Sequence, residues 1–204
     1  MVIISSIILQ QKGIYMYKNS LLALIFLFSL IFQGCSEKKS ESSEVQEVNS
    51  MVSKNEYVLS SLKNEQYIIT KEGEGFILEG AEGKVVILDI FATWCPPCRA
   101  AAEHLSRLQK KYKDDLVVIG LSVEDGITNT KLAEFQKEYS AEYVLVNSEA
   151  NRRLISELAT TLKLGERFPI PVMALYKDGK LINHYIGAIE EEFINSDIKR
   201  ALGK

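Results

Sequence analysis

A predicted strand and a predicted helix meet at two cysteines in the middle of this chain, and that junction restricts the fold more than any other feature. Residues 85–91 form an apolar run interrupted only by Asp89, which predicts a strand covered on both faces. The segment Trp94-Cys95-Pro96-Pro97-Cys98 follows shortly after it. Proline is tolerated in the first turn of a helix, so the two prolines predict that a helix begins here.

Two cysteines at such a junction are arranged for reversible dithiol–disulfide chemistry. The unpaired N–H groups and the dipole of a helix N-terminus favour negative charge. We therefore expect a thiolate on Cys95 to be stabilised, with a pKa below the free value of about 8.5. Cys98, one turn further into the helix, would attack a mixed disulfide formed on Cys95 and release the substrate.

Two cysteines separated by two residues also form half of a common zinc site. Such a site normally needs a second ligand pair at matching spacing, and the chain offers only Cys35, His104 and His184. The redox interpretation is therefore favoured, and we expect neither a metal nor another cofactor. The two histidines are expected to be surface or packing residues, and Arg99 to be a solvated surface charge.

The N-terminal segment has the pattern of an export signal. Lys18 precedes an apolar run at residues 21–32, and Gly34-Cys35-Ser36 ends it. The run is too short to span a bilayer comfortably, and the pattern is typical of a secretory signal. Its ending is similar to a bacterial lipobox, in which the cysteine is lipidated after cleavage. We expect a signal peptide over residues 1–35, with Met16 as an alternative start and Cys35 as the lipidation site.

An uncleaved anchor helix is the alternative interpretation of the same segment. Both interpretations leave the rest of the chain outside the cytoplasm, in a periplasm or at the outer face of the cell membrane, and tethered to it. Lipidation of Cys35 would leave Cys95 and Cys98 as the only thiols, in a compartment where structural disulfides persist. This usage favours a protein that acts on the thiols of other proteins.

Residues 36–55 and 56–204 differ sharply in composition. The first range is rich in Ser, Glu, Lys and Asn and cannot bury enough apolar surface to offset its ordering entropy, so we expect a flexible tether. The second range has the length of one domain. The net charge of −3 and the absence of a basic patch in the sequence argue against nucleic acid as a partner.

Apolar runs and helical patterns alternate along the domain, and the first three runs suggest an N-terminal hairpin region. The alternation predicts an α/β fold with a parallel core sheet, flanked by helices and made mixed by a final antiparallel hairpin. The predicted strands are residues 57–59, 67–70, 76–78, 85–91, 116–123, 143–146, 172–176 and 181–186, and the predicted helices are residues 97–112, 128–139, 151–162 and 190–202.

The segment from Asp89 to Arg99, DIFATWCPPCR, resembles the active-site segment of the thioredoxin superfamily, most closely its TlpA/ResA-like extracytoplasmic branch. The resemblance implies a thioredoxin-like fold over residues 57–204, with an inserted helix and strand within residues 128–162. It also implies a membrane-tethered thiol:disulfide oxidoreductase that reduces envelope proteins, for example in cytochrome c maturation. A DsbD/CcdA-type membrane protein would return the electrons. We expect a monomer. An isomerase is disfavoured as a further alternative, because the sequence shows no separate dimerisation segment beyond the tether.

Ile170-Pro171 is the second landmark of this resemblance. Gly179 and Gly187 follow Pro171 at the spacing that thioredoxins show between the active-site proline and two later glycines, whereas Pro169 is two residues out of step. The resemblance implies a cis peptide bond before Pro171, which would face the Cys95 sulfur. The backbone exposed at Ile170 would then pair with an extended substrate strand.

Trp94 and Pro96 are further candidates for substrate binding because they flank Cys95 in the sequence. Trp94 is expected to form a flat apolar shoulder beside the dithiol. An ordinary core position is the alternative for this side chain.

Asp89 lies six residues before Cys95 in an otherwise apolar strand. A buried carboxyl group is costly unless it is neutral or paired, and a solvent-facing position is the alternative. The resemblance to thioredoxins implies that Asp89 accepts the proton of Cys98, directly or through water. Gly120 stands where thioredoxins have a lysine near this aspartate, so the partner of Asp89 is left open.

Three other functions are alternatives to a reductase. A disulfide-forming oxidant would use the same two cysteines in the opposite direction. A thiol peroxidase is disfavoured because its threonine-plus-cysteine arrangement is missing. A non-catalytic binding module on the same scaffold is disfavoured because both Cys95 and Cys98 are present.

Overall fold

The computed structural model describes residues 54–204. The predicted signal peptide, the alternative start at Met16, Cys35 and the predicted tether up to residue 53 lie outside the described residues. Within them the elements follow in this order: β1 (Glu56–Ser60), β2 (Gln66–Glu72), β3 (Gly75–Leu78), β4 (Val85–Phe91), α3 (Pro96–Lys111), β5 (Leu116–Ser122), α4 (Asn129–Glu138), β6 (Val144–Val146), α5 (Ala150–Thr161), β7 (Val172–Lys177), β8 (Lys180–Ile186) and α6 (Glu191–Ala201).

The central sheet has the strand order β6-β5-β4-β7-β8. Strands β4, β5 and β6 run parallel, and β7 and β8 are antiparallel to their neighbours. Every residue of β4 is buried, as expected for the middle strand of a sheet covered on both faces. The predicted mixed α/β fold is confirmed, with each predicted element within a few residues of its observed bounds.

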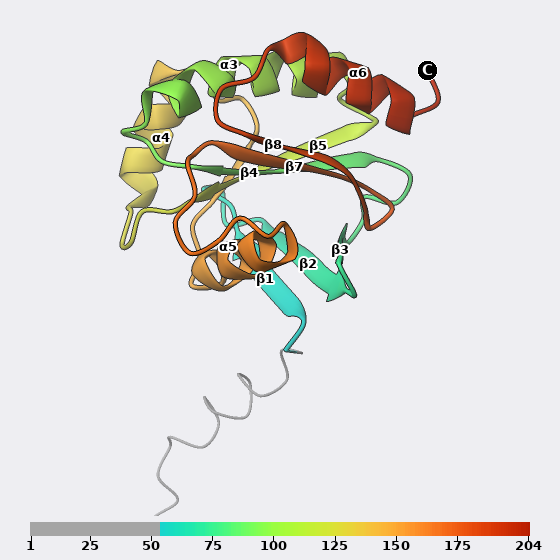
Figure 1. The fold of residues 1–204 in the computed structure, drawn as a ribbon. Helices are drawn as coiled ribbons and strands as arrows, with labels where there is room; N and C mark the ends of the chain where they lie inside the picture. Colours follow the sequence, from blue (N-terminus) through green and yellow to red (C-terminus); the bar gives the residue numbers. More distant parts are fainter. Residues whose placement is uncertain (1–53) are drawn as a thin grey trace, which may run out of the picture. The chain divides into compact units, whose positions relative to one another are not determined.

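Alternate residues of β4 contribute to two different cores. Val85, Ile87 and Phe91 belong to a cluster that includes Leu105 of α3 and residues of α6. Since side chains alternate between the faces of a strand, Val86, Leu88 and Ile90 belong to the opposite cluster. Figure 1 shows α3 and α6 on one side of the sheet and α5 with β1–β3 on the other.

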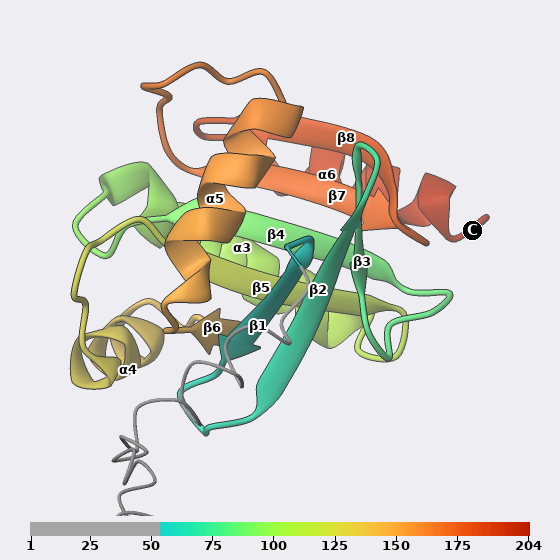
Figure 2. The ribbon, with the colours of Figure 1, turned by 90° about the horizontal axis from the view of Figure 1, so that it is seen from below.

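The second face of the central sheet carries an N-terminal three-stranded sheet of order β1-β2-β3. The predicted hairpin region is therefore two successive hairpins, as each neighbouring pair of strands is antiparallel. Figure 2 shows these strands and α5 lying across this face. The Phe76 N–H donates to the Gly179 carbonyl at 3.1 Å, and this bond joins β3 to the turn between β7 and β8.

Residues 128–162, where an inserted helix and strand are expected, contain two helices and a strand, namely α4, β6 and α5. Strand β6 extends the edge of the central sheet beside β5. Helix α5 buries Leu154 and Leu158 in the core that lies between the central sheet and β1–β3. The insertion therefore widens the sheet and covers one of its faces.

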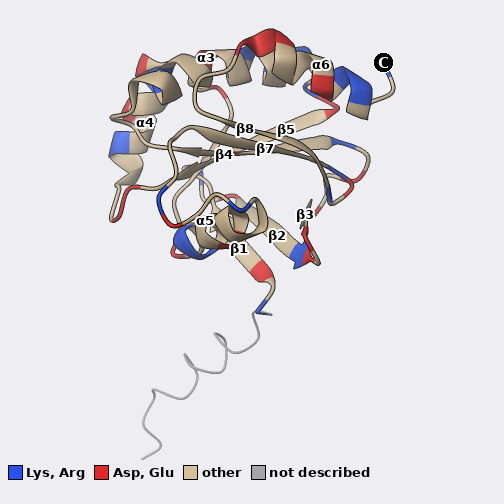
Figure 3. Cartoon of the chain, in the orientation of Figure 1, with Lys and Arg blue, Asp and Glu red and all other residues tan. Residues whose placement is uncertain are grey.

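Charged side chains lie mainly on the helices and loops around the sheet, and the strands β4, β5 and β7 are largely free of them (Figure 3). Asp89 is the exception in the interior of β4, where it is 2% exposed. Across residues 54–204, no helix combines the length and hydropathy needed to cross a membrane.

The core over α3 predicts how the fold responds to a cavity. Leu105 is fully buried between α3 and the sheet, so Leu105→Ala should lower the free energy of unfolding by about 2–5 kcal/mol. Leu181→Ala removes the same atoms from a side chain that is 40% exposed and should cost less than about 1 kcal/mol. Urea unfolding of the reduced full-length chain measures both values. Equal losses in the two variants would contradict this packing.

Candidate active site

The two cysteines lie where β4 gives way to α3. Cys95 is the N-cap residue of α3, with an extended backbone, and Pro96 and Pro97 occupy the first positions of the helix. Cys98 lies in the first turn. The predicted strand–loop–helix junction is confirmed, and the prolines fit it because their missing N–H groups would have no partner there.

Both sulfurs are withdrawn from solvent. Cys95 is 3% exposed and Cys98 is 2% exposed, and both are free thiols. Burial raises the pKa of the Cys98 thiol, and a hydrogen bond with Cys95 and the nearby Asp89 charge raise it further, against a smaller opposing effect of the Ala92 backbone. Proton removal from Cys98 therefore requires a neighbouring acceptor.

The Ile170–Pro171 segment lies directly against the first cysteine. The peptide bond between these two residues is cis, and the Cys95 thiol donates to the Ile170 carbonyl with 3.6 Å between Sγ and O. The Gly187 N–H donates to the Pro171 carbonyl at 2.8 Å. This last bond holds the segment at the end of β8, beside the dithiol.

Trp94 and Pro96 lie on the outside of this junction. Trp94 is 60% exposed, so it is not an ordinary core residue, and Pro96 is exposed as well. A pocket of about 270 Å³ begins at the neighbouring Pro97, between the first turns of α3 and the segment before α6, and its lining includes Ala101 and Ile189 together with the polar His104 and Glu190. The surface around Cys95 is therefore largely apolar.

Asp89 projects from β4 into the same interior as Cys98. Its Oδ2 atom accepts a hydrogen bond from the Tyr143 hydroxyl at 3.3 Å, and its Oδ1 atom has no hydrogen-bond partner among residues 54–204. Burial raises the pKa of Asp89 to about 7, although the Tyr143 hydrogen bond acts in the opposite direction. A carboxyl group with this pKa can exchange a proton near neutral pH.

Glu124 holds the loop that precedes Cys95. Its carboxylate accepts from the Thr93 backbone N–H at 2.6 Å and from the Thr93 hydroxyl at 3.1 Å, and it pairs with Lys131 at 2.8 Å. Burial favours the neutral acid, but the hydrogen bonds from Lys131 and Thr93 outweigh it and lower the pKa of Glu124. The loop is thereby fixed to the end of β5.

Arg99 fastens the same loop from α3. Its Nε donates to the Thr93 carbonyl at 2.8 Å, and its guanidinium carbon lies 5.0 Å from the centre of the Tyr139 ring. The expectation that Arg99 is a solvated charge is therefore wrong. A planar guanidinium can donate a hydrogen bond and lie over an aromatic face at once, and the backbone of Thr93 supplies the acceptor.

Sequence reasoning missed Thr93, Glu124 and Tyr143. One available signal was the position of Glu124 directly after β5, because polar groups at the carboxyl ends of parallel strands gather at one edge of the sheet. His104 and His184 are half-buried and lie in α3 and β8. In the described part of the chain, no group of three or more His, Cys, Asp or Glu side chains is placed to hold a metal ion.

The sequence of this chain is similar to those of known bacterial proteins. ResA of Bacillus anthracis, named a thiol-disulfide oxidoreductase, is 26% identical over 137 residues, which cover 66% of this chain and 73% of ResA. The thioredoxin-like protein YneN of Bacillus subtilis strain 168 is 43% identical over 53 residues, but that match covers 26% of this chain and only 31% of YneN.

A solved structure supports the fold. The thiol:disulfide interchange protein of the thioredoxin family from Chlorobium tepidum TLS has a TM-score of 0.56 and 18% identity, with 74% of this chain and 97% of that chain covered. Residues 62–202 match the Redoxin family. The chain therefore belongs to the Redoxin family, as a TlpA/ResA-like member of the thioredoxin superfamily whose relatives are thiol–disulfide oxidoreductases.

Proposed function

We propose that this protein is an extracytoplasmic thiol:disulfide reductase, tethered to a membrane by a lipid on Cys35. The observation that carries the proposal is the pair of buried thiols at the start of α3, with Cys95 seated against the Ile170 carbonyl. Disulfides in envelope proteins, such as those that form between the haem-binding cysteines of apocytochromes c, are the proposed substrates.

The reaction transfers two electrons from the dithiol to the substrate. The Cys95 thiolate attacks one sulfur of the substrate disulfide, forms a mixed disulfide and releases the other substrate sulfur as a thiolate. Cys98 then gives its proton to the Asp89 carboxylate and attacks the Cys95 sulfur. The Cys95–Cys98 disulfide forms, and the second substrate sulfur leaves as a thiolate that takes up a proton.

The role of Asp89 follows from burial. An isolated Cys98 thiol at this depth resists ionisation, and its pKa is raised. A carboxyl group with a pKa of about 7 in the same interior can take the proton without a charge having to cross an apolar layer. The proton is then passed on as the site opens to solvent on release of the substrate.

The direction of electron transfer depends on how strongly the reduced form of the dithiol is stabilised, because a strongly oxidising site, such as that of DsbA, stabilises its reduced form. We propose the reducing direction for this protein. A disulfide-forming oxidant that uses the same two cysteines is the alternative.

The exposed apolar surface supports a protein substrate. Trp94 and Pro96 flank Cys95 on the solvent side, and Ile170 and Pro171 lie on the other side of it. We propose that an extended substrate segment lies between them and that the backbone of Ile170 pairs with it. A DsbD/CcdA-type membrane protein is the proposed electron donor, and the protein is proposed to act as a monomer.

The exchange mechanism assigns different losses to the two cysteines. Cys95→Ser should abolish the reduction of insulin, because no nucleophile remains, whereas Cys98→Ser should accumulate a mixed disulfide with insulin that dithiothreitol releases. Non-reducing electrophoresis and mass spectrometry identify this adduct. Cys35→Ser is the matched control and should keep its turnover in detergent. Undiminished insulin reduction by Cys95→Ser would overturn the assignment of Cys95 as the nucleophile. A wild-type chain that fails to reduce insulin would leave a binding module as the alternative.

The Glu124–Thr93 contact predicts a local loss of stability. Thr93 is buried, so Glu124→Ala leaves its N–H without an acceptor and should cost about 1–3 kcal/mol of unfolding free energy. Glu124→Gln keeps an acceptor and should lose less. Asp125→Asn, which alters a neighbouring ion pair with both side chains more than three-quarters exposed, is the control and should change little.

The same contact has a defined pH dependence. Because the folded state lowers the pKa of Glu124, its charge stabilises the fold above the ordinary carboxyl pKa, and this contribution is lost as the pH falls through the lowered value. The difference between the wild type and Glu124→Gln in urea unfolding should therefore shrink in acid. A difference that grows as the pH falls would contradict the assignment.

A further inference from the structure

The ionisable neighbours of Asp89 are few. On β4 its register partners are Gly120 of β5 and Met173 of β7, and neither side chain titrates. Cys98 of α3 faces it, with Cys95 hydrogen-bonded to Cys98. The remaining titratable side chain is Tyr143, whose hydroxyl donates to Asp89 Oδ2.

Gly120 makes room for Tyr143. A Cβ atom at residue 120 would lie 3.1 Å from Cε2 of Tyr143, 3.1 Å from Cε1 of Phe91 and 2.7 Å from Cδ2 of Leu145. These distances are shorter than normal carbon–carbon contacts. The ring of Tyr143 thus occupies space beside β5 that any larger residue at position 120 would take, and through this space it reaches the carboxyl group.

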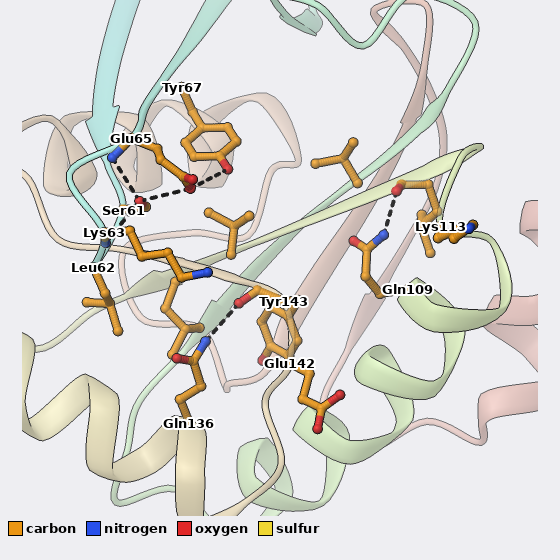
Figure 4. A pocket seen from close by; sticks show the side chains of 14 residues that line it. Ser61, Leu62, Lys63, Glu65, Tyr67, Gln109, Lys113, Gln136, Glu142 and Tyr143 are labelled. Carbon is orange, nitrogen blue, oxygen red and sulfur yellow. Dashed lines mark hydrogen bonds between the residues drawn. The ribbon is translucent and has the colours of Figure 1, made fainter.

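The position of Tyr143 is fixed from its backbone side. The residue directly precedes β6, and the amide nitrogen of Gln136 on α4 donates to the Tyr143 carbonyl at 3.1 Å (Figure 4). Tyr143 also lines a pocket of about 580 Å³ at the β6 edge of the sheet, yet it is only 6% exposed. Its hydroxyl is therefore held inside the protein, with Asp89 as its acceptor.

A hydrogen bond from this donor favours one protonation state of Asp89 over the other. A hydroxyl that donates to a carboxylate stabilises the ionised form, in opposition to burial, which favours the neutral acid. Within residues 54–204, Tyr143 provides the only hydrogen bond to the Asp89 side chain, since Oδ1 has no partner. Among the described residues, the Tyr143 hydroxyl is thus the one hydrogen-bond donor that shifts the balance between the two forms of Asp89 toward the carboxylate.

We propose that Tyr143 is a positioning residue that sets the protonation equilibrium of Asp89, and with it the pH range in which Cys98 resolves the mixed disulfide. The kinetic part of this inference rests on the proposed role of Asp89 as proton acceptor, whereas the effect of Tyr143 on the carboxyl group does not. Tyr143 touches neither substrate nor sulfur in this scheme and acts through Asp89.

Tyr143→Phe tests the inference because it removes the hydroxyl and keeps the ring. The carboxylate then loses its donor, so the pKa of Asp89 should rise. The expected rise is about 0.5–1 unit, which is less than an ordinary hydrogen bond to a charged group provides, because this hydrogen bond is long. Carbon-13 NMR of aspartate-labelled full-length protein measures this pKa, with the Asp89 signal assigned by its loss in Asp89→Asn. The oxidised form is used, so that neither cysteine titrates.

Tyr176→Phe is the matched control. Tyr176 is also buried, and its hydroxyl has no hydrogen-bond partner among the described residues, but it belongs to the core on the other face of the sheet. The same loss of one buried hydroxyl there should leave the pKa of Asp89 unchanged. An unchanged pKa in Tyr143→Phe, or an equal rise in Tyr176→Phe, would overturn the inference.

The kinetic arm separates this inference from the proposed function. Reaction with 5,5′-dithiobis(2-nitrobenzoate) releases one coloured thiolate when Cys95 attacks and a second when Cys98 resolves the adduct. In Tyr143→Phe the second phase should be about three- to tenfold slower on the acid side of its pH profile, with the midpoint moved upward by the same 0.5–1 unit.

Asp89→Asn is measured alongside. If its second phase is as fast as that of the wild type at every pH, the proposed acceptor role of Asp89 is wrong, and the NMR titration alone decides the role of Tyr143. If Asp89→Asn is slow but Tyr143→Phe keeps the wild-type profile, the inference about Tyr143 is wrong and the acceptor role stands.

Discussion

The first turn of α3 lies against the carboxyl end of β4, and this contact assembles the site. It buries both thiols at the edge of the core, brings Cys98 near Asp89 and seats Cys95 against the Ile170 carbonyl. The loop between the two elements has little freedom, because Glu124 and Arg99 hold the backbone of Thr93 from two sides. Because this loop is held rigidly, the two sulfurs can exchange bonds without a large rearrangement of the backbone.

Burial also determines how charge is distributed in the site. The interior around Asp89 and Cys98 disfavours ionisation of both groups, so a proton can move between them at a small cost in net charge. The hydrogen bond that the Tyr143 hydroxyl donates to Asp89 offsets part of the free-energy cost of burying the carboxylate. The proposed reductase thereby combines a buried Cys98 thiol, whose pKa is raised, with a proton acceptor that works near neutral pH.

The fold could be predicted from the sequence because its signals are local. The apolar run of β4 and the two prolines at the start of α3 each occupy adjacent residues, and the structure confirms both. The candidate site could be predicted only where it follows the motif. Glu124 lies 31 residues from Thr93, and Tyr143 lies 54 residues from Asp89, so neither partner leaves a pattern in the sequence around the cysteines. These pairs of residues come together only because β5 pairs with β4 and β6 pairs with β5 in the folded sheet.

The central claim is that the buried pair Cys95–Cys98 donates electrons, and its reduction potential tests this claim most directly. The full-length protein is equilibrated with glutathione and dithiothreitol buffers, and the fraction of disulfide is measured at each ratio. A potential near that of thioredoxin, about −270 mV, is the predicted result. A potential near that of DsbA, about −120 mV, would contradict the account and make the protein an oxidant.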